Sequence, residues 1–110
     1  LQEKALQERM SASEYQITFY DSQQQDELEE KVAVLMTAEH LTRVRRGKTY
    51  DLRPLILDLK VTYADDGEIG LWIRLNAEPS ATGRPDEVME ELGFANTSYL
   101  ACRTGLILNS

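Results

Sequence analysis

Basic side chains crowd into one short stretch of an otherwise acidic chain. The formal net charge is −7, yet arginine and lysine recur between positions 43 and 53. Guanidinium and ammonium groups at this density could bind the phosphates of RNA or an acidic partner surface, and nearby aromatic rings could stack on bases. The residues that could take part are Arg43, Arg45, Arg46, Lys48 and Arg53, with Tyr50 or Trp72 as the stacking face.

The same basic residues could instead have a structural role. They could pair with the acidic helices of the chain itself or keep an edge strand from aggregating. Affinity for nucleic acid depends on neutralising many phosphates, so a chain with this net charge should bind RNA weakly on its own. Trp72 is the more informative aromatic residue, because it falls on the polar side of its strand. Both interpretations stay open at this point.

Residues suited to catalysis or metal binding are few. His40 is the only histidine and Cys102 the only cysteine, so a Ser-His-Asp hydrolase or a zinc site lacks its usual groups. We expect His40 at the C-terminus of a helix and Cys102 as a core residue in the reducing cytoplasm. HExxH, CxxC, P-loop and GxGxxG motifs are absent from the sequence. The chain is therefore predicted to lack a catalytic centre of its own.

Two acidic groups invite comparison with metal sites. Asp65, Asp66 and Glu68 surround Gly67, where the chemistry of a hairpin turn explains them without calcium. The carboxylates between positions 26 and 30 fall in the first turns of a predicted helix, where the helix dipole favours negative charge. Both groups are interpreted as structural.

Hydrophobic periodicity divides the chain into strands and helices. Helical spacing predicts helices over residues 23–40 and 84–94, the first opening with a Ser22/Gln25 capping box and the second ended by Gly93. Strand-like alternation predicts a strand over 13–20, two short strands around Gly47 within 40–52, a hairpin from 53–63 and 69–76, and a closing strand over 98–108. In the hairpin, Leu57, Leu59 and Val61 are expected to face the core.

This order of elements predicts an α+β domain that resembles a ferredoxin-like sandwich. Its sheet would be mainly antiparallel, with two helices on one face. Residues 13–110 are predicted to form this single domain. Residues 1–12, which begin without an initiator methionine, are expected to be a linker or the end of an upstream segment. The hydrophobic content of 42% and the lack of a long apolar run predict a folded, soluble, cytoplasmic protein with no membrane contact.

Three motifs, in order along the chain, resemble one known family. They are GKTYDLRPLI (47–56), GRPDEVMEELG (83–93) and CRTGLIL (102–108). Together they resemble the C-terminal half of a radical-SAM-associated domain of unknown function, which is fused to or encoded beside radical S-adenosylmethionine proteins. The positions carried over by motif are Asp51, Arg53, Pro54, Arg84, Pro85 and Arg103. The arginines could tie loop carbonyls or Asp51 together, or they could converge on an RNA phosphate.

The resemblance implies a role beside a radical-SAM iron–sulfur enzyme, in a setting that suggests RNA modification. The cysteine triplet that would hold a 4Fe–4S cluster is missing, so the cluster and S-adenosylmethionine are expected only in a partner domain or protein. The leading hypothesis is a non-catalytic accessory or recognition module of such a system. The alternatives are an independent RNA-binding module that uses the basic 43–53 hairpin, and a protein–protein docking domain.

Overall fold

The computed structural model of the chain describes residues 10–78 and 81–108. The expected upstream segment falls largely on residues 1–9, which lie outside this part. In chain order the elements are β1 (Met10–Phe19), α2 (Gln25–Thr37), β2 (Thr42–Arg45), β3 (Lys48–Asp51), the 3-10 helix η1 (Arg53–Leu55), β4 (Ile56–Tyr63), β5 (Ile69–Glu78), β6 (Ala81–Thr82), α3 (Pro85–Glu91) and β7 (Tyr99–Leu108). The predicted helices and strands are all present, with shifted ends.

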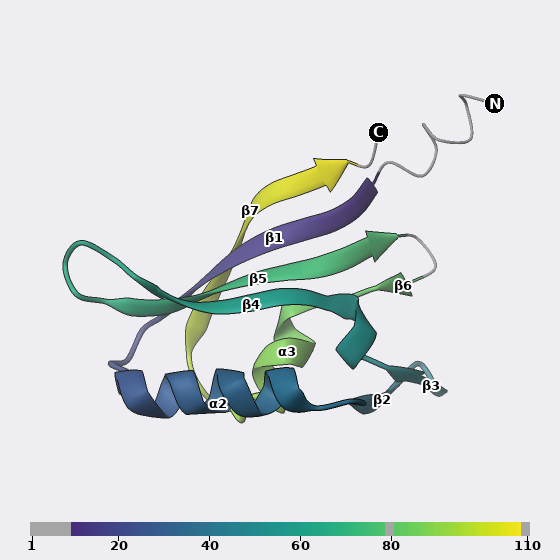
Figure 1. Cartoon of the computed structure of the whole chain (residues 1–110), viewed down its shortest axis with the longest axis horizontal. Coiled ribbons are helices and arrows are strands. Elements are labelled where there is room, and N and C mark those ends of the chain that lie inside the picture. The colour runs from purple at the N-terminus through teal and green to yellow at the C-terminus, as the bar shows by residue number, and fades with distance from the viewer. Residues whose placement is uncertain (1–9, 79–80, 109–110) are drawn as a thin grey trace.

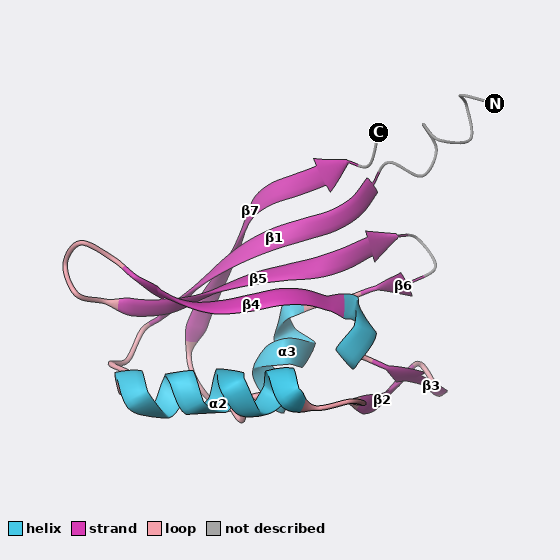
Figure 2. Cartoon of the chain, viewed as in Figure 1, coloured by secondary structure: helices cyan, strands magenta, loops and turns pink. Residues whose placement is uncertain are grey.

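The large sheet has the strand order β4-β5-β1-β7, and each neighbouring pair is antiparallel. The short β6 pairs with β5, while β2 and β3 form a separate two-stranded sheet. Helices α2 and α3 lie on the same side of the large sheet (Figure 1). Coloured by secondary structure, the chain shows a sheet layer above a helical layer (Figure 2). The predicted α+β class with a mainly antiparallel sheet is confirmed.

The core fills the space between the helices and one face of the sheet. Because side chains alternate along a strand, β5 turns Leu71, Ile73 and Leu75 towards the core and Trp72 towards the opposite face. Leu28 of α2 and Met89 of α3 are buried against the same cluster. Burying one such side chain contributes about 1.5–3 kcal/mol to the free energy of folding. The other face of the sheet is left without a helical cover in the described chain.

Strand β4 departs from simple alternation at its start. Its register with β5 shifts between Ile56 and Asp58, and such a bulge re-aims the side chains around it. As a result Ile56 and Leu59 are buried, whereas Leu57 is 45% exposed. The expectation that Leu57 faces the core is therefore wrong, and the same expectation for Leu59 is confirmed.

Strand β7 forms an edge of the sheet and pairs with β1. Cys102 lies opposite Gln16, on the face turned away from the helices, and is exposed. The expectation of a buried core cysteine is therefore wrong. The physical reason is that alternation assigns Cys102 to the open face, which no helix of residues 10–78 and 81–108 covers, while an edge position leaves one flank of the strand uncovered.

The two helices begin differently. Gln24, not Ser22, is the N-cap of α2 and makes no side-chain capping bond, so the predicted Ser22/Gln25 capping box is wrong. The Gln25 amide instead donates to Glu29 over 3.2 Å. Helix α3 starts at Pro85, as expected for a residue that lacks the N–H, and Gly93 follows its end with a φ of 93°. The predicted end of the second helix is confirmed.

The bulge in β4 can be tested by a pair of leucine substitutions. We expect Leu59→Ala to lower the free energy of unfolding by about 2–4 kcal/mol, because it leaves a cavity in the core. Leu57→Ala, the matched control two positions away, should cost less than about 1 kcal/mol, because that side chain is already half-exposed. Urea denaturation measures both. Equal losses would mean that β4 alternates without the bulge.

Candidate functional site

The basic stretch folds as a tight hairpin, as the sequence predicts. Strands β2 and β3 pair antiparallel, with Arg45 opposite Lys48. The turn residues Arg46 and Gly47 have φ angles of 53° and 79°. Positive φ at both central residues is the geometry that suits a two-residue hairpin. The hairpin therefore brings the backbone positions of its basic residues close together.

Two arginines of the hairpin are bound to carboxylates of α3. Arg43 donates to Glu91 over 2.7 Å and also pairs with Glu90. Arg45 donates two hydrogen bonds to Glu87, of 2.5 and 3.2 Å. The predicted structural alternative, arginines that pair with an acidic helix, is thereby confirmed for Arg43 and Arg45. We call this set of contacts the arginine clamp.

The centre of the clamp is the contact of Arg45 with Glu87 and Tyr50. The Glu87 side chain is buried, and the Arg45 guanidinium lies over the Tyr50 ring at 4.6 Å from its centroid. Burial alone would raise the pKa of Glu87, but hydrogen bonds from Arg45 and Tyr50 outweigh it and hold the pKa below its ordinary value. Burial, followed by the hydrogen bond with Glu87, raises the pKa of Tyr50. Glu87 is therefore a carboxylate held ionised in a mainly buried place.

The clamp also joins two of the three family-like motifs. Tyr50 belongs to GKTYDLRPLI, and Glu87 belongs to GRPDEVMEELG. Arg45 hydrogen-bonds both side chains, with 3.2 Å to the Tyr50 hydroxyl. The acidic residues of α3 are visible in the sequence. Arg45, however, lies 42 residues before Glu87, and only the fold brings the two side chains together.

Asp51 and Arg53 organise the segment after the hairpin. Asp51 accepts backbone N–H bonds from Leu41 and Arg53 at 2.7 and 3.1 Å, and its Oδ2 lies 2.7 Å from His40 Nδ1. The His40 bond and then the Leu41 bond lower the pKa of Asp51. The Arg53 guanidinium donates to the carbonyls of Met36 and Ile56. Arg53 thus ties the last turn of α2 to the start of β4, a structural role like the one expected, although neither carbonyl belongs to a loop.

The remaining basic candidates lie exposed on separate elements. Arg46 lies in the hairpin turn and Lys48 follows the turn, while Arg84 is the N-cap of α3 and Arg103 lies on the edge strand β7 opposite Tyr15. Within the described residues no hydrogen bond or ion pair of these four side chains is found. Because Arg53 points its donors at interior carbonyls, it shares no partner with Arg84 or Arg103. A common anion site of the three arginines stays a prediction.

The open face of the sheet carries the one tryptophan of the chain. Trp72 is half-buried on β5 and lies between two cations, with Lys60 Nζ 5.4 Å and the Arg74 guanidinium 5.1 Å from its ring. Arg74 also donates twice to Glu14, at 2.8 and 3.0 Å, and Lys60 lies 3.6 Å from Asp58. The indole is therefore framed by charged groups that are themselves paired. We call this surface the Trp72 platform.

A polar bridge borders the Trp72 platform. The Gln16 amide on β1 reaches across β5 and donates to the Thr62 hydroxyl on β4 over 2.9 Å. Gly70 lies between them, and a Cβ there would come within 2.5 Å of the Ile17 carbonyl and 2.9 Å of the Gln16 nitrogen. Only glycine leaves room for this bridge. The face next to Trp72 therefore offers neutral hydrogen-bonding groups, beside a small hollow that Gln16, Thr62 and Gly70 help to line.

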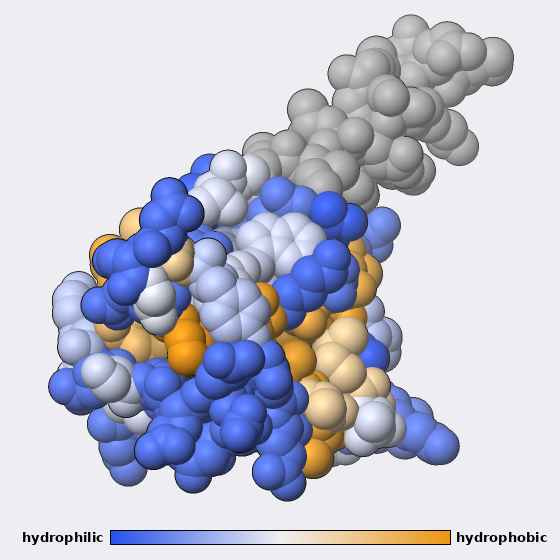
Figure 3. Space-filling model, turned by 60° about the vertical axis from the view of Figure 1, so that its left-hand side comes forward, coloured by the Kyte–Doolittle hydropathy of each residue, from blue (hydrophilic) through white to orange (hydrophobic). Residues whose placement is uncertain are grey.

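Exposed apolar side chains mark a further candidate surface. Val34 on α2 is 63% exposed, and apolar surface interrupts a largely hydrophilic side of the molecule in Figure 3. Beside Val34, between α2 and α3, lies a groove of about 440 Å³. No local sequence pattern indicates this groove, because it depends on how two helices far apart in the chain pack.

Groups suited to catalysis do not gather at one place in the described chain. His40 is exposed and contacts Asp51, while Cys102 lies on β7. Among residues 10–78 and 81–108, no group of three or more histidine, cysteine or acidic side chains is placed to hold a metal ion. Asp66 accepts from the Glu68 backbone over 3.0 Å, as predicted for a turn. None of the helices described is long and apolar enough to span a membrane.

Comparison with known proteins does not identify a family for the chain. No protein-family model matches it, and no curated protein matches it at a significant level.

We expect the arginine clamp to contribute to the stability of the fold. Removing one partner of a fully buried ion pair costs about 3–5 kcal/mol. Because Arg45 keeps 25% side-chain exposure, we expect Arg45→Met to lower the free energy of unfolding by about 2 kcal/mol at neutral pH. Lys48→Met removes the same charge from an exposed position of the same hairpin and should change stability by less than about 0.5 kcal/mol.

The pH dependence of the stability difference between the parent chain and Arg45→Met is the internal control. The pKa of Glu87 is lowered in the folded chain, so its contribution is present above its unfolded pKa and is lost as the pH falls through the folded value. The stability gap between the parent chain and Arg45→Met should therefore close below about pH 4. Urea denaturation at several pH values measures it. A gap that stays constant with pH would show that lost packing, not the ion pair, causes the effect.

Proposed function

We propose that this chain is a non-catalytic recognition module that binds single-stranded RNA on the Trp72 platform and serves a radical-SAM iron–sulfur enzyme system. The observation that carries the RNA part is Trp72 itself, a half-buried indole on the uncovered face of the sheet between Lys60 and Arg74. Aromatic rings on an open sheet are the usual stacking surface for unpaired bases.

On the Trp72 platform, base stacking would contribute more to RNA affinity than phosphate neutralisation would. An indole face contributes about 1–3 kcal/mol for each base that stacks on it. Lys60 and Arg74 already have carboxylate neighbours, so few phosphates would be newly neutralised and the salt dependence of binding should be shallow. Neutral donors and acceptors such as Gln16 and Thr62 could contact the edges of bases. The module would therefore bind an exposed base or loop, and with modest affinity.

RNA binding by the basic hairpin is less well supported. Arg43 and Arg45 are already engaged by carboxylates of α3, so phosphate would have to displace those partners. Arg46 and Lys48 remain exposed at the turn, and two cations give little affinity on an acidic chain. The platform is thus the better candidate surface for RNA.

The link to a radical-SAM system rests on the resemblance of the three motifs. Two of these motifs pack against each other, because Arg45 hydrogen-bonds both Tyr50 of the first motif and Glu87 of the second. This contact is consistent with the motifs belonging to one unit. With one cysteine, this chain cannot supply three thiolates, so the 4Fe–4S cluster and S-adenosylmethionine are proposed to be held by the partner. We also propose a ferredoxin-like topology, which the order β4-β5-β1-β7 with helices on one face supports.

The RNA proposal can be tested with a labelled single-stranded oligouridylate. Binding should quench the fluorescence of Trp72, which is the only tryptophan of the chain. By fluorescence anisotropy of the labelled RNA, we expect Trp72→Leu to weaken binding at least about fivefold. The control variant Arg46→Ala/Lys48→Ala should bind within about twofold of the parent chain, with a shallow salt slope in both cases.

Two results would contradict this assignment. Loss of binding in the Arg46/Lys48 variant, with Trp72→Leu unaffected, would move the RNA site to the hairpin. No binding to RNA by any form would remove the RNA function and leave protein docking as the role of the module.

The radical-SAM proposal has a separate test. A tagged form of this chain should capture a separately encoded radical-SAM protein, with iron and sulfide in the captured fraction. If the exposed arginines carried over from the motifs form the contact, Arg84→Ala/Arg103→Ala should reduce capture at least about fivefold. Arg46→Ala, an exposed arginine outside the motifs, is the control. Capture of no such protein would count against the proposal.

A further inference from the structure

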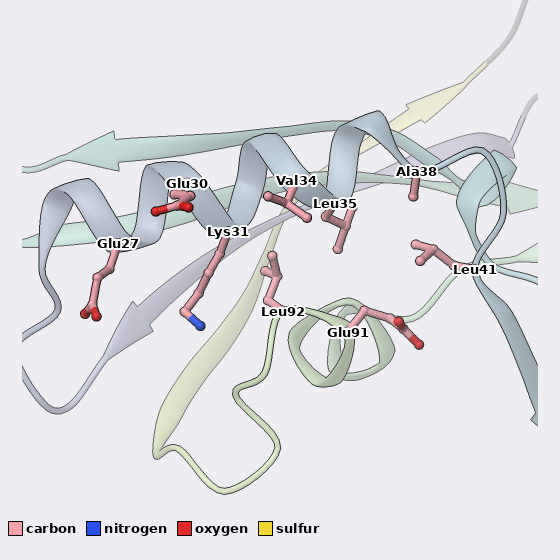
Figure 4. Close-up of a pocket in the computed structure, with 9 residues that line it drawn as sticks. All are labelled: Glu27, Glu30, Lys31, Val34, Leu35, Ala38, Leu41, Glu91 and Leu92. Atoms are coloured by element: carbon pink, nitrogen blue, oxygen red, sulfur yellow. The ribbon is translucent and has the colours of Figure 1, made fainter.

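We propose that the groove between α2 and α3 docks a basic amphipathic helix of a partner protein. The groove measures about 440 Å³ and lies in the helical layer, whereas the Trp72 platform lies on the other face of the sheet. This size is within the range of about 300–1,000 Å³ found for ligand sites. Figure 4 shows side chains from α2 pointing towards α3 across this space.

The base of the groove is apolar. Leu35 of α2 and Leu92 at the end of α3 are buried, and both are labelled in Figure 4 beside the opening. Val34 extends this surface outward with 63% of its area exposed. Ala38 follows Val34 by one helical turn and Leu41 continues the row. An apolar strip along a helix of this kind gains free energy when another apolar side chain covers it.

The rim of the groove has an excess of negative charge. Glu27 and Glu30 are exposed and form no ion pair within the described residues. Glu91, at the opposite wall, is already paired with Arg43 over 2.7 Å. Lys31 also lines this end of the groove, but its ammonium group lies over the Phe94 ring, 5.6 Å from the centroid, and it forms no ion pair with Glu27 or Glu30 within the described residues. Two free carboxylates of α2 therefore lie at one end of the apolar strip.

This combination fits one class of occupant better than the others. RNA is excluded by the negative rim, because phosphates would be repelled there. A second copy of the chain is disfavoured, since its own exposed helical surfaces are acidic and its net charge is −7. A helix with leucine-like residues on one face and lysine or arginine beside them would cover the strip and meet Glu27 and Glu30. This is the helix-in-groove mode of peptide recognition.

The groove and the Trp72 platform would give the module two independent surfaces. One face would hold a flexible polyanion, and the other would hold a cationic protein segment. The groove does not depend on the RNA proposal, because the two surfaces share none of the residues that define them.

The test uses a fluorescent synthetic peptide of leucine and lysine at helical spacing, titrated into the whole chain and followed by anisotropy. Val34→Ser removes apolar surface from an exposed position and should weaken binding at least about threefold. Glu27→Gln/Glu30→Gln should weaken it at least about fivefold. The charge-matched control Asp65→Asn/Glu68→Gln removes two carboxylates from the β4–β5 turn and should change binding less than about twofold. Circular dichroism of each variant confirms that the helices are retained.

Each outcome decides the proposal. Weaker binding by both groove variants, with the turn control unchanged, supports the groove. Equal weakening by the two double variants would show that the peptide responds to overall charge, and would overturn the assignment. Failure of the parent chain to bind the peptide would overturn it as well. None of these results depends on RNA, so failure here is distinguishable from failure of the RNA proposal.

Discussion

The burial of only one face of the antiparallel sheet is the constraint on which the rest of the structure depends. Leu71, Ile73 and Leu75 face α2 and α3 without contact with water, and the residues between them must therefore face the other way. With no helix on that side in the described chain, polar groups can keep their contact with water, which avoids the cost of burying them unpaired. Trp72 is the exception, because it places a large apolar ring on the polar face.

A second constraint is the position of the β2–β3 hairpin, which lies outside the large sheet. A two-stranded hairpin is marginally stable alone, so it needs support from a neighbour. The arginine clamp gives that support. The planar guanidinium of Arg45 can form two bonds with Glu87 while it stacks on Tyr50, a combination that lysine cannot reproduce. The same contacts remove positive charge from the surface, so stability and phosphate binding compete for these side chains.

Much of the fold could be predicted from the sequence, because it depends on local periodicity. Alternation placed Leu59 in the core and Trp72 on the open face, and helical spacing predicted both helices. The failures involve information that no local pattern holds. The exposure of Leu57 depends on a register shift, and that of Cys102 depends on which strand occupies the edge. For the candidate site, the residue types were visible, but their choice of partner was not.

The distribution of charge limits what the module can recognise. Of the basic residues between positions 43 and 53, Arg43 and Arg45 hold carboxylates and Arg53 holds backbone carbonyls. Strong phosphate binding needs many free cations. This acidic chain offers few of them between positions 43 and 53. We therefore propose recognition by an aromatic face and by an apolar groove, where affinity would come from stacking and from burial. The Trp72 platform is framed by cations, whereas the groove between α2 and α3 is bordered by carboxylates. The two surfaces therefore favour ligands of opposite charge, and a ligand of one surface should not compete with a ligand of the other.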